Sequence, residues 1–279
     1  MQEKLENKAP MISVIMGVYN CENTVSDAIN SVLNQTYQNF EFIICDDGST
    51  DTTLGIAEKY AHDYSDKIIL IRNDRNRGLN YTLNHCLKYA KGKYIARMDG
   101  DDKSLPVRFE KEVEFLENHS EISILGASLK AFDDKGIWGT HTFKEYPVAK
   151  DFLHGSPFSH SVCMVRREAY MAVDGYSEGK FLMRVEDYHL WTKMYSKGYK
   201  GANLQEELYL YRDDRDGYQK RKFRYRLNEA YVSLIAVKML HLPIWSCLYA
   251  IRPIVVGLLP SHIYEFLHKR KLKQGNEGI

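Results

Sequence analysis

Short apolar runs and longer amphipathic segments alternate along the first half of the chain, from Met11 to about Leu129. The apolar runs have the length of buried strands, and the segments between them repeat apolar residues with the 3.6-residue period of a helix. Strands are predicted at Met11 to Val18, Phe40 to Cys45, Ile68 to Ile71 and Tyr94 to Met98. This alternation is typical of an α/β fold with a parallel sheet covered by helices.

Helices are predicted in the intervening segments from their apolar stripes. The clearest stripe follows Gly78. A second helix is predicted after Asn23 or Thr24, either of which can cap it, and a third covers Thr52 to His62. Beyond Leu129 the pattern is less regular. It predicts a turn at Asp133 to Gly136, a strand-to-helix passage around Val162 to Ala172, and a helix from Glu186 to Lys197 that Gly198 ends.

The C-terminal segment is both basic and apolar. Residues Arg212 to Arg226 include seven basic side chains, and Tyr231 to Leu259 is strongly apolar but interrupted by charged residues, histidine and proline. No uninterrupted run reaches the roughly 18 to 20 residues of a spanning helix, so amphipathic helices lying on a membrane are predicted. The basic cluster His268 to Lys273 would contact anionic headgroups. The alternative is that the helices only pack on the preceding domain and that the tail is solvated.

Composition places the chain among globular proteins. Its 279 residues are 44% hydrophobic and 27% charged, which allows one large core with at most a small appended unit. Lysine and arginine (38) balance aspartate and glutamate (37), so no overall positive field favours nucleic acid. The five cysteines are scattered, without a CxxC pair, and predict reduced thiols in a cytosolic protein. The first ten residues contain no apolar run, so no secretory signal is predicted.

Polar loops follow three of the predicted strands, after Val18, Cys45 and Met98. In open α/β sheets, ligands bind at the carboxyl ends of the strands. The carboxylate pair Asp46-Asp47 could accept a hydrogen bond from the N–H group of a base, whereas we assign Asp51 to turn and capping chemistry.

The stretch Asp99-Gly100-Asp101-Asp102 places three carboxylates in one short loop. A hard divalent cation prefers oxygen ligands, and one or two carboxylates are sufficient when a nucleotide diphosphate completes the shell. Such an ion would stabilise the charge that grows on a leaving diphosphate. We therefore predict Asp101 as a metal ligand and Asp102 as a loop residue that caps the next helix.

A third acidic pair, Glu186-Asp187, begins a predicted helix. A carboxylate here could be the general base that removes a proton from an acceptor hydroxyl. By itself the pair is also a favourable arrangement with the helix dipole.

Together these motifs resemble the family 2 inverting glycosyltransferases with a GT-A fold, and in particular those of bacterial exopolysaccharide and biofilm-matrix biosynthesis. The resemblance rests on Val18-Tyr19-Asn20, Gln35-Thr36-Tyr37, Asp46 to Asp51, Gly92 to Asp102 and Glu186 to Trp191, in that order and spacing. It implies a mostly parallel, Rossmann-like sheet flanked by helices in a domain over 11–212, with a nucleotide-sugar half (11–129) and an acceptor half (130–212). Residues 1–10 would be a tail, and 213–279 a helical, membrane-associating extension.

Carried over residue by residue, the resemblance implies that Tyr19 brackets a uracil, Asp47 accepts its N–H group and Asp187 is the base. Asp99 would hold the ribose or a metal-bound water, and Asp101 would bind Mn²⁺ or Mg²⁺ at the diphosphate. Further candidates for nucleotide-sugar binding are Arg77 and Gly17, which replaces a proline common in the family. Secondary candidates are Asp46, Glu186, His160, His189, which replaces a common acidic residue, and Arg212.

The implied reaction is direct displacement with inversion, from a UDP-sugar to a hydroxyl of a lipid-linked glycan. The implied place is the cytoplasmic face of a bacterial plasma membrane, with a possible protein partner in a polysaccharide assembly complex and no nucleic acid. A nucleotidyltransferase would need a glycine-rich loop with a basic residue after the first strand, and a dehydrogenase would need GxGxxG there; neither is present. A binding or regulatory protein built on the same scaffold remains an alternative.

Overall fold

The computed structural model describes residues 10–214, 222–260 and 263. The predicted basic cluster His268 to Lys273 and part of the Arg212 to Arg226 stretch lie outside the described residues. The strands are β1 (Ile12–Val18), β2 (Phe40–Asp46), β3 (Ile68–Arg72), β4 (Tyr94–Asp99), β5 (Lys103–Ser104), β6 (Ile122–Asp133), β7 (Gly136–His141), β8 (Met164–Arg166) and β9 (Lys200–Arg212). The α-helices are α1 (Val25–Leu33), α2 (Thr53–Asp63), α3 (Leu79–Leu87), α4 (Arg108–Asn118), α5 (Arg167–Ala172), α6 (Glu186–Ser196), α7 (Phe223–Met239) and α8 (Ile251–Leu258), and the 3₁₀ helices are η1 (Ala149–His154), η2 (His160–Val162) and η3 (Ile244–Ala250).

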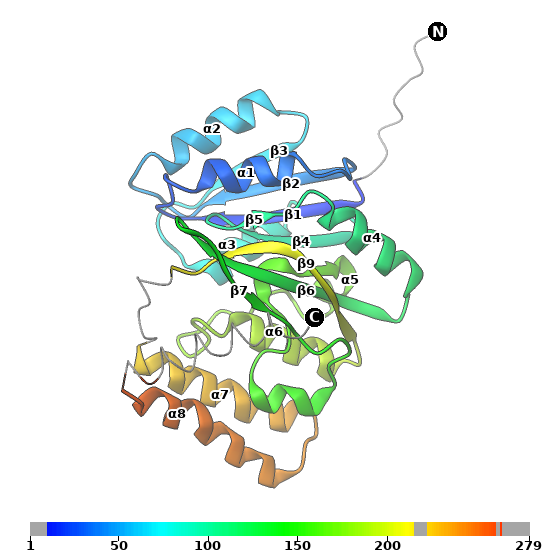
Figure 1. Cartoon of the computed structure of the whole chain (residues 1–279), viewed down its shortest axis with the longest axis vertical. Coiled ribbons are helices and arrows are strands. Elements are labelled where there is room, and N and C mark those ends of the chain that lie inside the picture. The colour runs from blue at the N-terminus through cyan, green and yellow to red at the C-terminus, as the bar shows by residue number, and fades with distance from the viewer. Residues whose placement is uncertain (1–9, 215–221, 261–262, 264–279) are drawn as a thin grey trace.

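The strands of the described chain form one sheet in the order β3-β2-β1-β4-β8-β6-β9-β5, with β7 paired to β6 (Figure 1). The pairs β3-β2, β2-β1 and β1-β4 are parallel, as predicted for the first half. Beyond β4 the sheet is mixed, because the short strand β8 runs antiparallel to both β4 and β6, while β6 and β9 are parallel. The parallel part therefore contains the strand ends at which the site is predicted, and the mixed part extends the sheet beyond β4.

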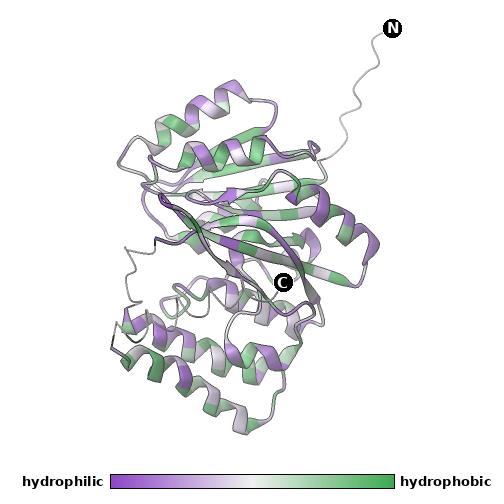
Figure 2. Ribbon diagram, viewed as in Figure 1, coloured by the Kyte–Doolittle hydropathy of each residue, from purple (hydrophilic) through white to green (hydrophobic). Residues whose placement is uncertain are grey.

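Hydrophobic residues pack on both faces of the sheet. One core includes apolar residues of α1, α2 and α4, and the other includes those of α3, α5, α6 and α7. Figure 2 shows the strands as mainly hydrophobic between helices of mixed colour. A sheet buried on both sides explains why its strands are continuous apolar runs.

The predicted elements of the first half are confirmed within one or two residues, and so is the turn between β6 and β7. The passage from β8 to α5 and the helix α6 are also confirmed, and Gly198 follows α6 with a φ of 88°. That left-handed conformation suits glycine and ends the helix where the sequence predicted.

The described part of the C-terminal segment is helical, as predicted. Helix α7 packs on α6 and η1, and η3 and α8 pack on α7, at the end of the molecule opposite α2 (Figure 1). No helix in the described part of the chain is long and apolar enough to cross a bilayer.

Candidate active site

Three loops of the candidate site leave the same edge of the sheet. Gly17 on β1 pairs in register with Cys45 on β2 and with Asp99 on β4. Since neighbouring strands lie about 4.8 Å apart, the backbones at the ends of β2 and β4 are separated by about 10 Å. The loops predicted after Val18, Cys45 and Met98 therefore lie at the same end of the sheet.

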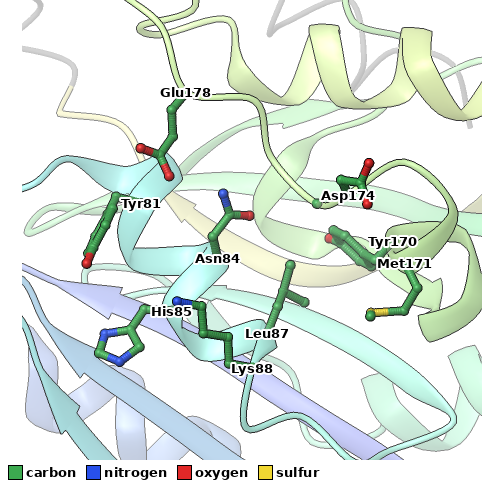
Figure 3. Close-up of a pocket in the computed structure, with 10 residues that line it drawn as sticks. Tyr81, Asn84, His85, Leu87, Lys88, Tyr170, Met171, Asp174 and Glu178 are labelled. Carbon is green, nitrogen blue, oxygen red and sulfur yellow. The ribbon is translucent and has the colours of Figure 1, made fainter.

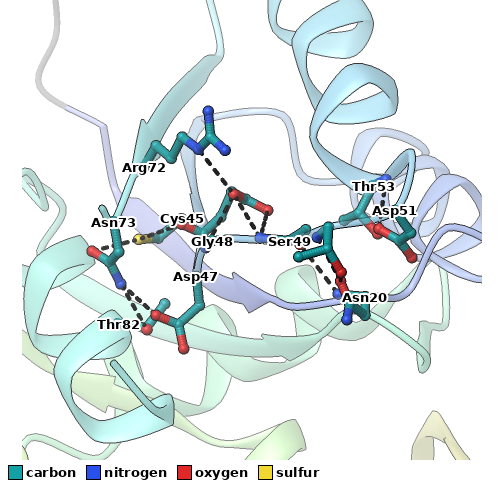
Figure 4. Close-up of polar contacts among 12 residues, drawn as sticks. Asn20, Cys45, Asp47, Gly48, Ser49, Asp51, Thr53, Arg72, Asn73 and Thr82 are labelled. Atoms are coloured by element: carbon teal, nitrogen blue, oxygen red, sulfur yellow. Dashed lines mark hydrogen bonds and ion pairs between the residues drawn. The ribbon is translucent and has the colours of Figure 1, made fainter. Parts of the chain in front are cut away.

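Asp46 faces inward and shapes the turn after β2. Its carboxylate is fully buried and accepts hydrogen bonds from the backbone N–H groups of Gly48 and Ser49 at 3.2 Å (Figure 4). The Nε atom of Arg72 lies 3.5 Å from the same carboxylate. This arrangement makes Asp46 a structural support of the site, and any contact with a ligand stays a prediction.

Asp47 links the end of β2 to the loop between β3 and α3. Its carboxylate accepts hydrogen bonds from Asn73 Nδ2 at 2.7 Å, from the Arg77 backbone N–H at 2.8 Å and from the Gly78 backbone N–H at 2.9 Å. An ionised carboxylate has about four acceptor positions, so one direction is left for a base N–H. The Arg77 guanidinium lies 4.2 Å from the centroid of the Tyr81 ring. The predicted contacts of Asp47 and Arg77 with the nucleotide stay predictions.

Asn73, which the sequence did not single out, holds Asp47 in place. It is buried, and its Nδ2 atom donates to Asp47 (Figure 4). Its Oδ1 atom lies 2.8 Å from His85 Nδ1. We expect Asn73→Ala to weaken UDP binding by roughly tenfold and to lower the free energy of unfolding by about 1–3 kcal/mol, because polar partners are left unpaired. Isothermal titration and thermal unfolding measure the two effects. Asn80→Ala is the matched control, since Asn80 bonds Ser177 on the other side of α3; equal UDP affinity in the two variants would contradict the prediction.

Gly48 allows the Asp47 turn to approach the β3–α3 loop. Its φ is +72°, and a Cβ atom there would lie 2.7 Å from the Cα atom of Arg75. We expect Gly48→Ala to cost about 1–2 kcal/mol through the left-handed backbone alone, and more as the loop is displaced, so that UDP binding also weakens. Gly55→Ala is the control, because Gly55 lies in α2 with nothing within 4 Å of its added Cβ. A thermal unfolding temperature that falls no further for Gly48→Ala than for the control would refute this.

The loop after β1 is tied to the loop after β2. The Asn20 backbone N–H donates to Ser49 Oγ at 3.1 Å, and Asn20 Oδ1 accepts from the Thr50 backbone N–H at 2.8 Å. Tyr19, just before this link, has an exposed side chain, as a ring that brackets a base requires. Gly17 instead packs against α3, where its Cβ would lie 2.9 Å from Thr82 Cγ2, so its predicted ligand contact has no support in its packing.

Asp51 has the capping role predicted for it. Its Oδ1 atom accepts a hydrogen bond from the Thr53 backbone N–H at 3.0 Å, at the start of α2. Its other oxygen accepts from the Glu22 backbone N–H at 3.3 Å, which joins the turn to the loop after β1.

The acidic loop after β4 lies next to Arg97, a buried and positively charged side chain of β4. Arg97 is fully buried, and its Nη2 atom lies 2.6 Å from Asp99 Oδ1. The Asp101 side chain reaches solvent. Even so, the loss of hydration caused by the surrounding protein, together with the charge of Asp99, raises the pKa of Asp101 to about 6. Arg97 and Arg212 oppose this increase. The loop therefore presents carboxylates whose mutual repulsion a further cation would relieve.

The prediction that Asp102 caps the following helix is wrong. Helix α4 begins only at Arg108, and Asp102 is instead buried, with its Oδ1 atom accepting a hydrogen bond from the Arg212 backbone N–H at 2.7 Å. This bond fastens the end of β9 to the acidic loop. It also brings Arg212 to the site, where its guanidinium is 2.6 Å from Asp134 and 3.4 Å from Asp214.

Glu186 and Asp187 lie in the first turn of α6. Both side chains are half-buried, and burial together with the charge of Asp187 raises the pKa of Glu186, while Arg184 and Arg97 lower it. The short helix η2 links α6 to β4, because the Arg97 backbone N–H donates to the Cys163 carbonyl oxygen at 2.9 Å and the rings of His160 and Trp191 have centroids 6.2 Å apart. Helix α6 and the strand that leads into the acidic loop are therefore both neighbours of η2, and a contact of Asp187 with an acceptor stays a prediction.

The two candidate histidines occupy different surroundings. His160 Nε2 lies 2.8 Å from the Tyr176 hydroxyl, and burial and the Arg97 charge hold the pKa of His160 well below its usual range. His160 is therefore a neutral, hydrogen-bonded residue beneath the site. His189 lies two positions after Asp187 on α6, so it projects from a different face of the helix. Burial lowers the pKa of His189 to about 4, and Lys193 adds to this. A contact of His189 with the acceptor stays a prediction.

Arg97 is the main residue of the candidate site that the sequence analysis missed. A signal was available, because a charged residue stands in the middle of an otherwise apolar predicted strand, Tyr94 to Met98. Buried charges are rare unless they are paired, so such a residue indicates a charged neighbourhood. Asn73 gives no comparable signal, since it follows a strand like many loop residues.

The carboxylates of the site suit a hard divalent cation that is also bound by a ligand. Among the residues that the structure describes, no three His, Cys, Asp or Glu side chains form a ready-made metal cage. Mg²⁺ and similar ions do not need one, since they are usually held by one or two carboxylates together with substrate phosphates. Asp99 and Asp101 supply such oxygen ligands at the edge of the loop, so the residues fit the predicted ion.

A separate pocket lies on the other side of α3, between this helix and the segment that follows α5 (Figure 3). His85 and Lys88 line it from α3, and Asp174 and Glu178 line it from the facing segment. His85 also contacts Asn73, so the pocket adjoins the support of Asp47 without containing any of the predicted site residues.

The fold and the family are those of known glycosyltransferases. The structure superimposes on the crystal structure of S. aureus TarS 1-349 in complex with UDP-GlcNAc with a TM-score of 0.67 and 19% sequence identity, covering 92% of this chain and 79% of the TarS 1-349 chain. This likeness shows the GT-A fold that the motifs predicted.

Two curated relatives span nearly the whole chain. The putative glycosyltransferase EpsE of Bacillus subtilis (strain 168) is 41% identical over 98% of this chain and 98% of its own length. WfaP of Escherichia coli, named UDP-Glc:alpha-D-GlcNAc-diphosphoundecaprenol beta-1,3-glucosyltransferase, is 30% identical over 93% of this chain and 98% of its own. The family model "Glycosyl transferase family 2" matches residues 13–174. With more than half of the chain in that match, the chain belongs to glycosyl transferase family 2.

Proposed function

We propose that this glycosyltransferase moves a hexose or N-acetylhexosamine from a UDP-sugar to a hydroxyl of a lipid-linked glycan, with inversion, in exopolysaccharide biosynthesis. The observation that carries the proposal is that the acidic loop after β4, where Asp99 pairs with the buried Arg97, and α6, which begins with Glu186 and Asp187, are both neighbours of η2. One group of carboxylates can hold a cation and its diphosphate, and the other can accept a proton from an attacking hydroxyl.

The nucleotide would lie across the loops after β1 and β2. Tyr19 has the exposure that stacking on a base requires, and Asp47 has one acceptor direction left for the uracil N–H group. The presence of UDP-GlcNAc in the TarS complex supports a UDP-sugar donor. Arg77, whose backbone bonds Asp47, would contact the base or the diphosphate.

Asp101, assisted by Asp99, would hold Mn²⁺ or Mg²⁺ against the diphosphate. The ion, when bound, supplies positive charge that stabilises the departing UDP. Arg97 keeps Asp99 oriented by a charge-assisted hydrogen bond of 2.6 Å. Arg212 lies close enough for its charge to act on Asp101 and would approach the diphosphate from the acceptor side.

Asp187 would take the proton from the acceptor hydroxyl as its oxygen attacks C1 of the donor sugar. The C1–O bond to the diphosphate breaks in the same step, so the anomeric configuration inverts and no covalent intermediate forms. Glu186, which precedes it in the first turn, would help to set the local charge.

The acceptor and the location are inferred from a relative. The name of WfaP places its acceptor on diphosphoundecaprenol, a membrane lipid carrier. By analogy, this chain would act in the cytoplasm at the inner face of the plasma membrane, where a polysaccharide assembly complex could supply a protein partner.

A donor panel tests the proposal. Purified protein is incubated with each of several UDP-sugars and with GDP-mannose, with Mn²⁺ or EDTA, and with polyprenyl-diphosphate-linked sugars as acceptors; nucleotide release is measured, and the anomeric configuration of the product is determined by NMR. We expect cation-dependent release of UDP from at least one donor and an inverted product. Retention of configuration would overturn the mechanism, release of GDP alone would overturn the donor class, and no nucleotide binding or turnover with any donor would overturn the proposal as a whole.

A further inference from the structure

Several large apolar side chains of the segment formed by η3 and α8 lie on its outer side. Five of them are between 52% and 83% exposed and follow a helical spacing: Ile244, Leu248, Ile251, Val255 and Leu258. We refer to these five residues as the outer stripe. Trp245 lies beside it and is 60% exposed.

The opposite side of the same segment is made of small residues. The buried positions are Ser246, Ala250, Pro253 and Gly257, again at helical spacing. A Cβ atom added to Gly257 would lie 3.0 Å from side-chain atoms of Phe223 and Arg226, so the small side is packed closely on α7. Along α8, at 100° per residue, Ile251, Val255 and Leu258 fall on the side opposite Pro253 and Gly257.

This arrangement is the reverse of a helix that meets water. A surface helix normally buries its large apolar residues and exposes polar ones, whereas here the large residues are outside and small residues form the contact. Contiguous exposed apolar surface of this kind marks a site of protein or membrane contact. A second apolar phase must therefore cover the outer stripe.

The sequence around the stripe favours a bilayer with anionic headgroups. From Ala230 to Tyr264 there is no aspartate or glutamate, whereas Lys238 and Arg252 are present. An acid-free apolar helix with tryptophan at its surface is typical of a segment that lies in the membrane interface.

The chain beyond α8 adds complementary charge. Lys269, Arg270, Lys271 and Lys273 follow Leu258 by eleven to fifteen residues. A chain of eleven residues can extend roughly 35–40 Å, so these cations are within reach of the headgroups of a bilayer that holds the stripe. Each lysine or arginine near an anionic surface adds about 1 kcal/mol of attraction.

The stripe is fixed relative to the catalytic domain. Arg252 Nη1 donates to the His154 carbonyl oxygen at 2.7 Å, which fastens α8 to η1, and α7 packs between α8 and α6. We infer that the outer stripe and Trp245 insert into the interface of an anionic phospholipid bilayer and that the protein sits on the membrane with α8 against it and α2 at the far end (Figure 1). This inference concerns binding to the lipid surface and does not depend on the transfer reaction.

Flotation with vesicles tests the inference. The full chain is mixed with vesicles of phosphatidylglycerol and phosphatidylcholine or of phosphatidylcholine alone, and the bound fraction is measured. We expect binding to the anionic vesicles, weaker binding to the neutral ones, and a loss of at least tenfold in Leu248→Asp/Leu258→Asp, since each leucine removed from the interface weakens binding by roughly tenfold. Ile137→Asp is the matched control, because Ile137 is 57% exposed on β7, outside the stripe.

Quenching by brominated lipid locates the contact. Tryptophan fluorescence is expected to be quenched by vesicles that contain dibrominated phosphatidylcholine in the wild type but not in Trp245→Phe, although Trp138 and Trp191 remain. Three results would overturn the inference: equal vesicle binding by wild type and double variant, vesicle binding without quenching of Trp245, or a dimer in light scattering that the double variant abolishes while no vesicle binding is seen. The last would identify a second copy of the chain as the occupant. Thermal unfolding of each variant confirms that it is folded.

Discussion

Asp187→Asn is expected to reduce sugar transfer by roughly 10²–10⁴-fold, which is the usual contribution of a general base. Asparagine keeps the size of the side chain but cannot take a proton, so the acceptor hydroxyl would attack unassisted. UDP binding in the presence of Mn²⁺ should stay within about twofold of the wild type, because α6 carries no part of the nucleotide loops. Initial rates with the donor found in the panel and titration calorimetry with UDP measure the two quantities.

A matched helix-start variant separates base catalysis from helix stability. Glu168 occupies the first turn of α5, as Asp187 does in α6. Glu168→Gln removes a charge of similar helix-dipole value, about 0.3–1 kcal/mol, and should leave transfer unchanged. If Asp187→Asn retains most of its activity, or if it loses UDP binding instead, Asp187 is not the base.

The fold of the first half was predictable because β1, β2 and β4 are buried on both faces and the helices between the strands have apolar stripes. Strands β2 and β4 both pair in parallel with β1, so the end of β2 at Asp46 and the end of β4 at Asp99 lie at the same end of the sheet. The second half was less predictable. Strand β9 carries Glu206 and Glu207 in its middle, and β6 pairs with strands on both sides by contacts that are distant in sequence. Local periodicity does not contain such pairings.

The places of the candidate residues in the fold were predictable, but their supports were not. Asp47 and Asp101 lie in the expected loops and Asp187 lies in the expected first turn of α6, whereas the residues that orient them are recognised only from packing. Asp102 illustrates the reason: its neighbour in space is the Arg212 backbone, which is 110 positions away in sequence. A carboxylate before a predicted helix suggests a helix cap. In the structure Asp102 instead binds the backbone at the end of β9, a strand that is distant in sequence.

These supports also define what the substitutions should do. Asn73 and Gly48 keep the nucleotide loop in place, so their loss affects stability and UDP binding together. For the acids at the surface of the loops we expect the opposite: their proposed role is to bind a ligand, so their loss should weaken binding without lowering stability. A residue of this second kind should be dispensable for folding and essential for binding.

Asp101→Asn should show that balance most clearly. It is expected to weaken Mn²⁺-dependent UDP binding by on the order of 10–100-fold, since a direct ligand matters at least as much as the outer partners of a metal site. UDP binding in EDTA should be unchanged. Asp102→Asn is the control, because asparagine can still accept the hydrogen bond from the Arg212 backbone. Both are measured by titration calorimetry, and a Mn²⁺-independent loss of UDP affinity would contradict the ligand role.

The same variant should also make the protein more stable at neutral pH. Crowding by the protein and the charge of Asp99 raise the pKa of Asp101 from 3.8 to about 6, so the folded state disfavours ionisation that the unfolded state permits. Below about pH 3 Asp101 is protonated in both states, so the wild type and Asp101→Asn should unfold at equal temperatures. Between about pH 4 and pH 6 the wild type loses stability relative to the variant, and above this interval the variant should unfold at a constantly higher temperature. If instead the wild type gained stability over this interval, the Asp101 carboxylate would be held by donors in the fold, and it would have no unmet charge with which to attract a cation.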